Sequence, residues 1–140
     1  MKSKIIVLIS LILLISCDTD GNEPIDANEN SLIGEWKMTE SYISDGGSKY
    51  WQDANNGETI QFYENKKFVS NRFNACDTGI FSIKENELAL NYMCSEFNSE
   101  SENVDGFITF TIDLYANYFI LTPTSGPICV EGCSYKYEKK

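Results

Sequence analysis

Thiols are the groups with the most specific chemistry in this sequence, which has five cysteines and no histidine. Four of them lie in the second half of the chain: Cys76, Cys94, Cys129 and Cys133. Four thiols can form two disulfides or one tetrahedral zinc site. Neither neighbouring pair has the Cys-x2-Cys spacing that is common in zinc sites, so we expect disulfides and no metal if the chain is exported.

The N-terminal segment predicts export. Two lysines precede an apolar run over residues 5–15, which has the length of a signal peptide and is too short to span a bilayer. The run ends in Leu14-Ile15-Ser16-Cys17, which resembles the lipobox of bacterial lipoproteins, where cleavage leaves a cysteine that carries a diacylglycerol. We therefore expect residues 1–16 to be removed and Cys17 to hold the chain on a membrane. An ordinary signal peptide with an incidental cysteine is the alternative.

The following segment, residues 17–30, is polar and acidic after its cysteine and has no apolar periodicity, so it is predicted to be a flexible tether. Asp18, Asp20 and Glu23 resemble the acid-rich signal that sends some Gram-negative lipoproteins to the outer face of the outer membrane. An EF-hand calcium loop is disfavoured, because its glycine at position six and its glutamate at position twelve are absent. We therefore expect the protein in the cell envelope, anchored to the outer membrane, and the acidic residues favour the outer face of that membrane.

The net charge restricts the partners of the exported protein. Removal of residues 1–16 takes away two of the eleven basic residues and none of the twenty-one acidic ones, so the formal net charge changes from −10 to −12. Such an acidic surface opposes binding to nucleic acids and to anionic lipid headgroups. The expected membrane contact is therefore the lipid anchor.

Local geometry favours one of the three possible disulfide connectivities. A hairpin turn at residues 84–87 would bring Cys76 and Cys94 nearly opposite each other on adjacent strands, which is close to disulfide range. A turn at Glu131-Gly132 would do the same for Cys129 and Cys133. We expect these two pairs, although sequence alone does not exclude the other connectivities.

From residue 31 to residue 140 the sequence has the pattern of a single β domain, with β-branched and aromatic residues in short runs between Gly, Asn, Asp and Ser clusters. The eight expected strands are Glu35–Ile43, Glu58–Tyr63, Lys67–Asn74, Thr78–Lys84, Glu87–Tyr92, Gly106–Asp113, Tyr118–Thr122 and Cys129–Glu138.

These strands are predicted to form an all-β, eight-stranded antiparallel barrel in up-and-down order. Apolar and polar residues alternate clearly over residues 87–92 and 108–114, so one face is buried and the other is wet. Several connections have the length of hairpin loops, which makes consecutive strands neighbours, and closure removes the exposed edges. An immunoglobulin-like sandwich is the runner-up; the short separation of Cys76 and Cys94 argues against it.

Leu32-Ile33-Gly34-Glu35-Trp36 looks like the Gly-x-Trp motif that opens the first strand in lipocalins and the wider calycin group. The resemblance implies a lipocalin-like barrel in which Gly34 and Trp36 close one end, and a ligand pocket at the other end. In that family a basic residue near the final strand packs on the tryptophan. None is evident in the sequence, and Arg72 lies on a different strand.

Four residues are candidates for ligand binding. Tyr50 and Trp51 lie in the long polar loop over residues 44–57, which corresponds to the loop that covers the cup in lipocalins, and they could stack on a ligand or fold back as a plug. Glu40 would point inward with Trp36 unless a bulge breaks the alternation, and it could then pair with Arg72.

No catalytic constellation is present, because the chain has no histidine and no Ser-x-x-Lys or Gly-x-Ser-x-Gly element, so no enzyme activity and no cofactor are expected. Two functions are open. One is a lipid-anchored barrel that binds a small apolar or amphipathic ligand. The other is an interaction, structural or glycan-adhering accessory lipoprotein with a filled barrel, and a cavity in the lumen would separate the two.

Overall fold

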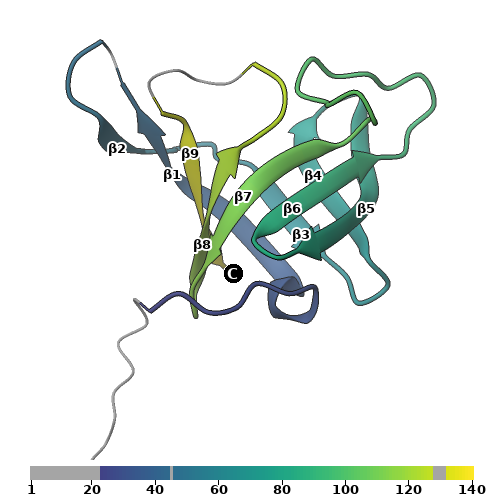
Figure 1. The fold of residues 1–140 in the computed structure, drawn as a ribbon, viewed down its shortest axis with the longest axis horizontal. Coiled ribbons are helices and arrows are strands. Elements are labelled where there is room, and N and C mark those ends of the chain that lie inside the picture. The colour runs from purple at the N-terminus through teal and green to yellow at the C-terminus, as the bar shows by residue number, and fades with distance from the viewer. Residues whose placement is uncertain (1–22, 45, 128–131) are drawn as a thin grey trace, which may run out of the picture.

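The computed structural model describes residues 23–44, 46–127 and 132–140, which form one β-barrel (Figure 1). The predicted signal peptide, Cys17 and Cys129 lie outside the described residues. The elements are η1 (Asn30–Leu32), β1 (Gly34–Ile43), β2 (Tyr50–Asp53), β3 (Thr59–Phe62), β4 (Lys67–Phe73), β5 (Cys76–Lys84), β6 (Glu87–Tyr92), β7 (Ile108–Leu114), β8 (Tyr118–Pro123) and β9 (Ser134–Lys139).

The sheet is antiparallel throughout and closes on itself, because β1 pairs with β9 as well as with β2 and β3. Strands β2 and β3 lie end to end along the same edge of β1, where residues 40–43 pair with β2 and residues 34–37 pair with β3. The closed ring therefore contains eight strands, and the predicted up-and-down barrel is confirmed.

Residues 44–57 were predicted to form a loop, but part of this segment forms strand β2. Tyr50–Asp53 continues the sheet beyond the barrel wall and forms a projecting hairpin with the upper half of β1 (Figure 1). Its four residues are all exposed, so the run has no alternation of buried and exposed positions by which a strand could have been recognised. The final strand also begins later than predicted, at Ser134.

The alternation of the remaining strands sets the core. Buried positions recur every second residue in β6, with Leu88, Leu90 and Tyr92, and in β7, from Ile108 to Leu114. Together with aromatic residues from β3, β4 and β8 they fill the lower lumen. The lower barrel is therefore a packed core.

Trp36 seals the closed end. The residue is 1% exposed, its Nε1 donates a hydrogen bond of 2.8 Å to the carbonyl oxygen of Leu32, and Phe119 packs on it with ring centroids 4.8 Å apart. Lys139 on β9 places its Nζ 5.3 Å from the centre of the tryptophan ring. Lys139 is thus a basic residue of the final strand that packs on the tryptophan, although none was evident from the sequence.

Gly34 lies beside this lysine. Its φ of +131° favours glycine, and a side chain there would touch the Cε atom of Lys139. The Gly-x-Trp element therefore acts as a unit with the last strand.

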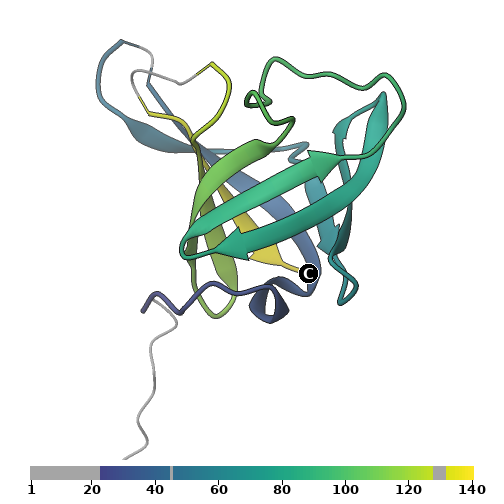
Figure 2. The same ribbon diagram turned by 45° about the vertical axis from the view of Figure 1, so that its right-hand side comes forward.

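Part of the predicted tether packs on the barrel. Ile25 N donates a hydrogen bond of 2.8 Å to the carbonyl oxygen of Leu114, and Ala27 packs against the core. Figure 2 shows this segment running beneath the barrel, at the end away from the β1–β2 hairpin. The packed chain therefore begins before residue 31. Among the described residues, no helix is long and apolar enough to cross a membrane.

Candidate ligand site at the barrel mouth

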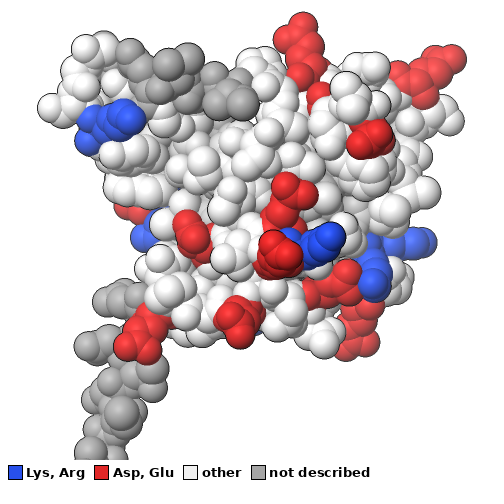
Figure 3. Space-filling model, viewed as in Figure 1, with Lys and Arg blue, Asp and Glu red and all other residues white. Residues whose placement is uncertain are grey.

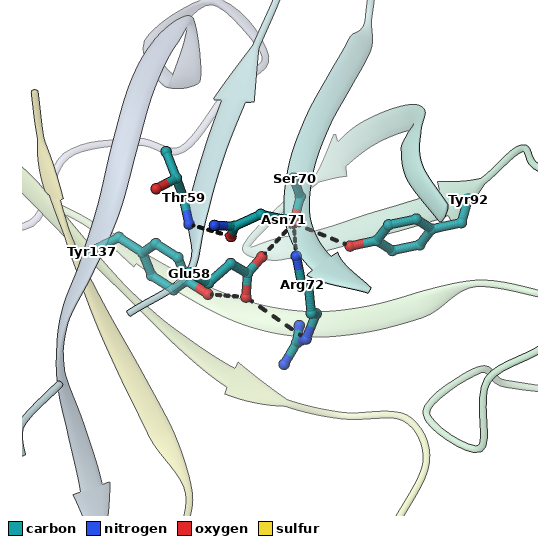
Figure 4. A network of polar contacts seen from close by, with 7 residues as sticks. All are labelled: Glu58, Thr59, Ser70, Asn71, Arg72, Tyr92 and Tyr137. Atoms are coloured by element: carbon teal, nitrogen blue, oxygen red, sulfur yellow. Dashed lines mark hydrogen bonds and ion pairs between the residues drawn. The ribbon is translucent and has the colours of Figure 1, made fainter. Parts of the chain in front are cut away.

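A polar network lies in the lumen above the packed core (Figure 4). Glu58 lies at its centre. Its Oε1 accepts a hydrogen bond of 2.8 Å from Ser70 Oγ, its Oε2 accepts one of 2.9 Å from the Tyr137 hydroxyl, and Oε2 lies 3.7 Å from Nε of Arg72. Tyr92 completes the network through its hydroxyl, 3.5 Å from Ser70 Oγ. The residues come from three strands and the segment before β3.

Local backbone geometry turns Glu58 inward. The carbonyl oxygen of Glu58 accepts a hydrogen bond from Met38 N, and the preceding Gly57 lies so close to the Met38 backbone that any side chain there would clash. Since Glu58 is two residues before the buried Ile60, it points to the same face. Asn71 Oδ1 accepts a hydrogen bond of 2.8 Å from Thr59 N and holds β3 and β4 together beside the site.

Arg72 is surrounded by aromatic rings. The carbon at the centre of its guanidinium lies 5.2 Å from the ring centroid of Phe110, 5.8 Å from that of Tyr135 and 5.9 Å from that of Phe73, within the range of cation–π interactions. Burial is the largest influence on Arg72 and acts to lower its pKa, but the charge of Glu58 and the neighbouring tyrosines together outweigh it, and the pKa is raised above its ordinary value. The guanidinium therefore stays charged inside the barrel.

The two tyrosines of the network stay protonated. Burial raises the pKa of Tyr92 to about 12, while the hydrogen bond with Ser70 acts in the opposite direction. Burial, and then the charge of Glu58, raise the pKa of Tyr137 well above its ordinary value. Both hydroxyls are therefore available as hydrogen-bond donors at any physiological pH.

A cavity of about 80 Å³ lies beside Arg72 at the mouth of the barrel. Its lining includes Arg72, Tyr135, Phe110 and Ile108 from the strands, and Ser101 and Ser125 from the loops above. Pockets for drug-sized ligands commonly measure about 300–1,000 Å³, so this cavity holds only part of such a molecule.

The loop after β6 covers one side of the mouth. The disulfide Cys76–Cys94 ties the start of this loop to β5, which confirms the first expected pairing. Phe97 then packs on Tyr92 and Phe73 at 5.3 and 5.1 Å between ring centroids.

The second expected disulfide pairing includes Cys129, which the structure does not describe, so it stays a prediction.

Glu40 does not enter the lumen. The register of β1 against β9 shifts between Met38 and Glu40, and this bulge turns Glu40 to the outer face, where its Oε2 pairs with Nζ of Lys136 at 2.9 Å. The expected inward orientation of Glu40 is therefore wrong. Arg72 does pair with a carboxylate, but that carboxylate is Glu58.

The two aromatic candidates separate onto opposite faces of the hairpin, because they are consecutive in a strand. Tyr50 pairs with Ile43 on the side that continues the lumen, whereas Trp51 pairs with Tyr42 on the outer side, with ring centroids 5.2 Å apart. Both are exposed, at 44% and 40%, so neither is a plug buried over the core.

Sequence reasoning missed Glu58, Tyr92 and Tyr137 as members of the site. A signal for Glu58 was present, since Glu58, Ile60 and Phe62 share one face of a predicted strand. The two tyrosines resemble ordinary core aromatics, and only the spatial arrangement identifies their hydroxyl contacts.

The outer surface has a larger hollow, but few charged side chains line it. A larger hollow of about 480 Å³ lies on the outer side of β4 and β5, where Val69 and Met93 are exposed and Lys67 brings the one charged side chain. Figure 3 shows acidic side chains spread over one face of the molecule, with fewer basic ones between them. Within the described part of the chain, no group of three or more Cys, Asp or Glu side chains could hold a metal ion.

No family model matches the sequence, and no curated protein matches it significantly. The fold is similar to that of a lipocalin-like protein from Bacteroides uniformis, with a TM-score of 0.51 and 16% identity over 79% of this chain and 99% of that chain. The chain has a lipocalin-like fold. A second similar structure, an uncharacterized protein from Bacteroides eggerthii, has a TM-score of 0.49 and 17% identity over 78% of this chain and 99% of that chain.

Proposed function

We propose that this protein is a lipid-anchored binding module of the cell envelope, which holds a small amphipathic molecule at the mouth of its lipocalin-like barrel. The observation that carries the proposal is the Arg72 guanidinium, which lies in the lumen beside a cavity although packing alone would favour an apolar side chain there. Charged groups kept in a barrel interior at such a cost commonly mark a binding site.

The packed lower lumen supports a ligand position at the mouth. A polar group of the ligand would enter the cavity beside Arg72, while its apolar part would lie higher, along the lumen-facing side of the β1–β2 hairpin. Tyr50 and Ile43 are on that side. Of the two aromatic candidates, Tyr50 therefore fits the role of a lid better than Trp51.

Native mass spectrometry of protein purified from the membranes of its host tests the proposal. We expect a bound small molecule that is lost on denaturation, and a lower occupancy in Arg72→Lys, because lysine keeps the charge but not the planar fork of donors. The matched control is Lys136→Arg, which changes the cation of the outer pair with Glu40 and should leave occupancy unchanged. Protein from the host without any bound small molecule would contradict the proposal.

The second candidate function is an interaction module that works through its surface. It is favoured by the projecting β2 strand, which ends the sheet and exposes Trp51 on its outer face. Loss of partner capture in Trp51→Ala, with unchanged small-molecule occupancy, would support this alternative.

A further inference from the structure

The cavity beside Arg72 is rich in hydrogen-bond donors. Nε of Arg72 faces Glu58, whereas the terminal nitrogens of Arg72, Ser101 Oγ and the Tyr135 hydroxyl have no acceptor among the described residues. These donors remain accessible to solvent. Among the described residues, Thr39 Oγ1 is the one side-chain polar atom that is both fully buried and without a hydrogen-bond partner. Three residues with unpaired donor groups therefore line the same small space.

The acceptors of Glu58 and Ser125 near the cavity already have partners. Glu58 accepts hydrogen bonds from Ser70 and Tyr137, and no carboxylate belongs to the cavity lining. Ser125 Oγ donates a hydrogen bond of 2.6 Å to the carbonyl oxygen of Ser101 and accepts one of 2.9 Å from Thr109 N. Arg72 is the one charged residue of the lining and its guanidinium only donates, so a ligand group that supplies acceptors matches this lining.

The donors are also held in place before any ligand arrives. The bond from Ser125 fixes the backbone of Ser101, and the close approach of Gly126 to Ser101 leaves no room for the two loops to slide. Arg72 is held between the rings of Phe110 and Tyr135. Donors positioned in advance bind an acceptor with a smaller entropic cost than mobile ones.

From this arrangement we infer that the polar group of the ligand is an oxyanion, either a carboxylate or a phosphate, bound by Arg72, Ser101 and Tyr135. The guanidinium matches both groups in geometry and charge. The cavity of about 80 Å³ accepts a group of a few heavy atoms. The inference rests on the proposed function, since it names the chemical class of the ligand bound at the same site.

Calorimetric titration with three probes that share one tail tests the inference: octanoate, octyl phosphate and 1-octanol. We expect at least one anion to bind about tenfold more tightly than 1-octanol, and the stronger of the two anions identifies the head group, because hydrogen bonds to a charged group contribute about 1.5–3 kcal/mol. Equal affinities for all three probes would overturn the inference and leave the proposed function standing. Binding of none of them would overturn the inference, whereas the proposed function depends separately on the molecule found in host-purified protein.

Single-donor variants locate the anion. Tyr135→Phe and Ser101→Ala each remove one hydroxyl and little volume, and each should weaken anion binding about tenfold while leaving 1-octanol unaffected. The matched control is Tyr118→Phe, which removes a tyrosine hydroxyl near the closed end of the barrel. Anion affinity that is unchanged in both variants would place the anion elsewhere and overturn the inference.

Discussion

At the scale of single residues, the Glu58–Arg72 pair is the least exposed ion pair among the described residues, with side chains 10% and 22% exposed. Its separation of 3.7 Å is longer than that of the outer pairs, and two neutral hydroxyls share the carboxylate. The pair therefore orients Glu58 toward three partners and leaves most of the guanidinium available. This arrangement suits binding better than stability.

Glu58→Gln tests the importance of this carboxylate for folding. The substitution keeps the shape but leaves the charge of Arg72 without a counterion in the lumen, so we expect the free energy of unfolding to fall by about 2 kcal/mol in urea denaturation. Glu40→Gln is the control, because it breaks an outer pair that solvent screens, and it should cost less than about 1 kcal/mol. Equal losses in the two variants would show that burial of the Glu58–Arg72 pair has no energetic consequence.

Glu40 and Glu58 show which side-chain orientations could be predicted from the sequence and which could not. The alternation of side chains predicted that Glu40 lies in the lumen, where it could pair with Arg72. The prediction was wrong for Glu40, because the bulge after Met38 depends on how β1 pairs with β9, far away in the sequence. Bulges of this kind follow from strand pairing, which a single strand does not encode.

At the scale of elements, the barrel strands were predictable because each buries every second residue, and the hairpin connections fixed their order. Strand β2 was not predictable, because it contacts solvent on both faces. The position of Cys94 followed from the same hairpin reasoning, since the β5–β6 register brings its strand end close to Cys76. The pairing of neighbouring strands could therefore be predicted from the sequence, whereas the packing of the loops above the mouth could not.

The Cys76–Cys94 disulfide fixes the loop that carries Phe97 and Ser101. Replacing both cysteines by alanine should lower the free energy of unfolding by about 3 kcal/mol, because the cross-link no longer restricts the unfolded chain. Hydrogen exchange in residues 95–107 should become faster, while the β7–β8 turn serves as the internal control. Octanoate affinity should fall as well, because Ser101 loses its fixed position. Unchanged exchange in the loop would show that the contacts of Phe97 and Ser125 hold it without the disulfide.

At the scale of the whole molecule, the closed end and the mouth face opposite directions. Ile25 lies beside the end of β7 at the closed end, whereas the β1–β2 hairpin and the loop that carries Ser101 lie at the other end (Figures 1 and 2). The described chain therefore reaches the barrel at the end opposite its mouth. The proposed lipid anchor would join the barrel at this closed end and leave the mouth unobstructed for a ligand.

Cys17→Ser tests the proposed lipid anchor. Removal of the sulfur from the predicted lipobox should prevent lipidation. The protein should then leave the membrane fraction, because the two or three acyl chains that would make the attachment nearly permanent are missing. The barrel should keep its melting temperature, since Cys17 precedes the packed chain that begins at Ile25. The Cys76→Ala, Cys94→Ala double variant is the control, because it also removes cysteines but should stay with the membranes after a carbonate wash. If Cys17→Ser protein also survives that wash in the membrane fraction, something other than a lipid on this cysteine holds the barrel there.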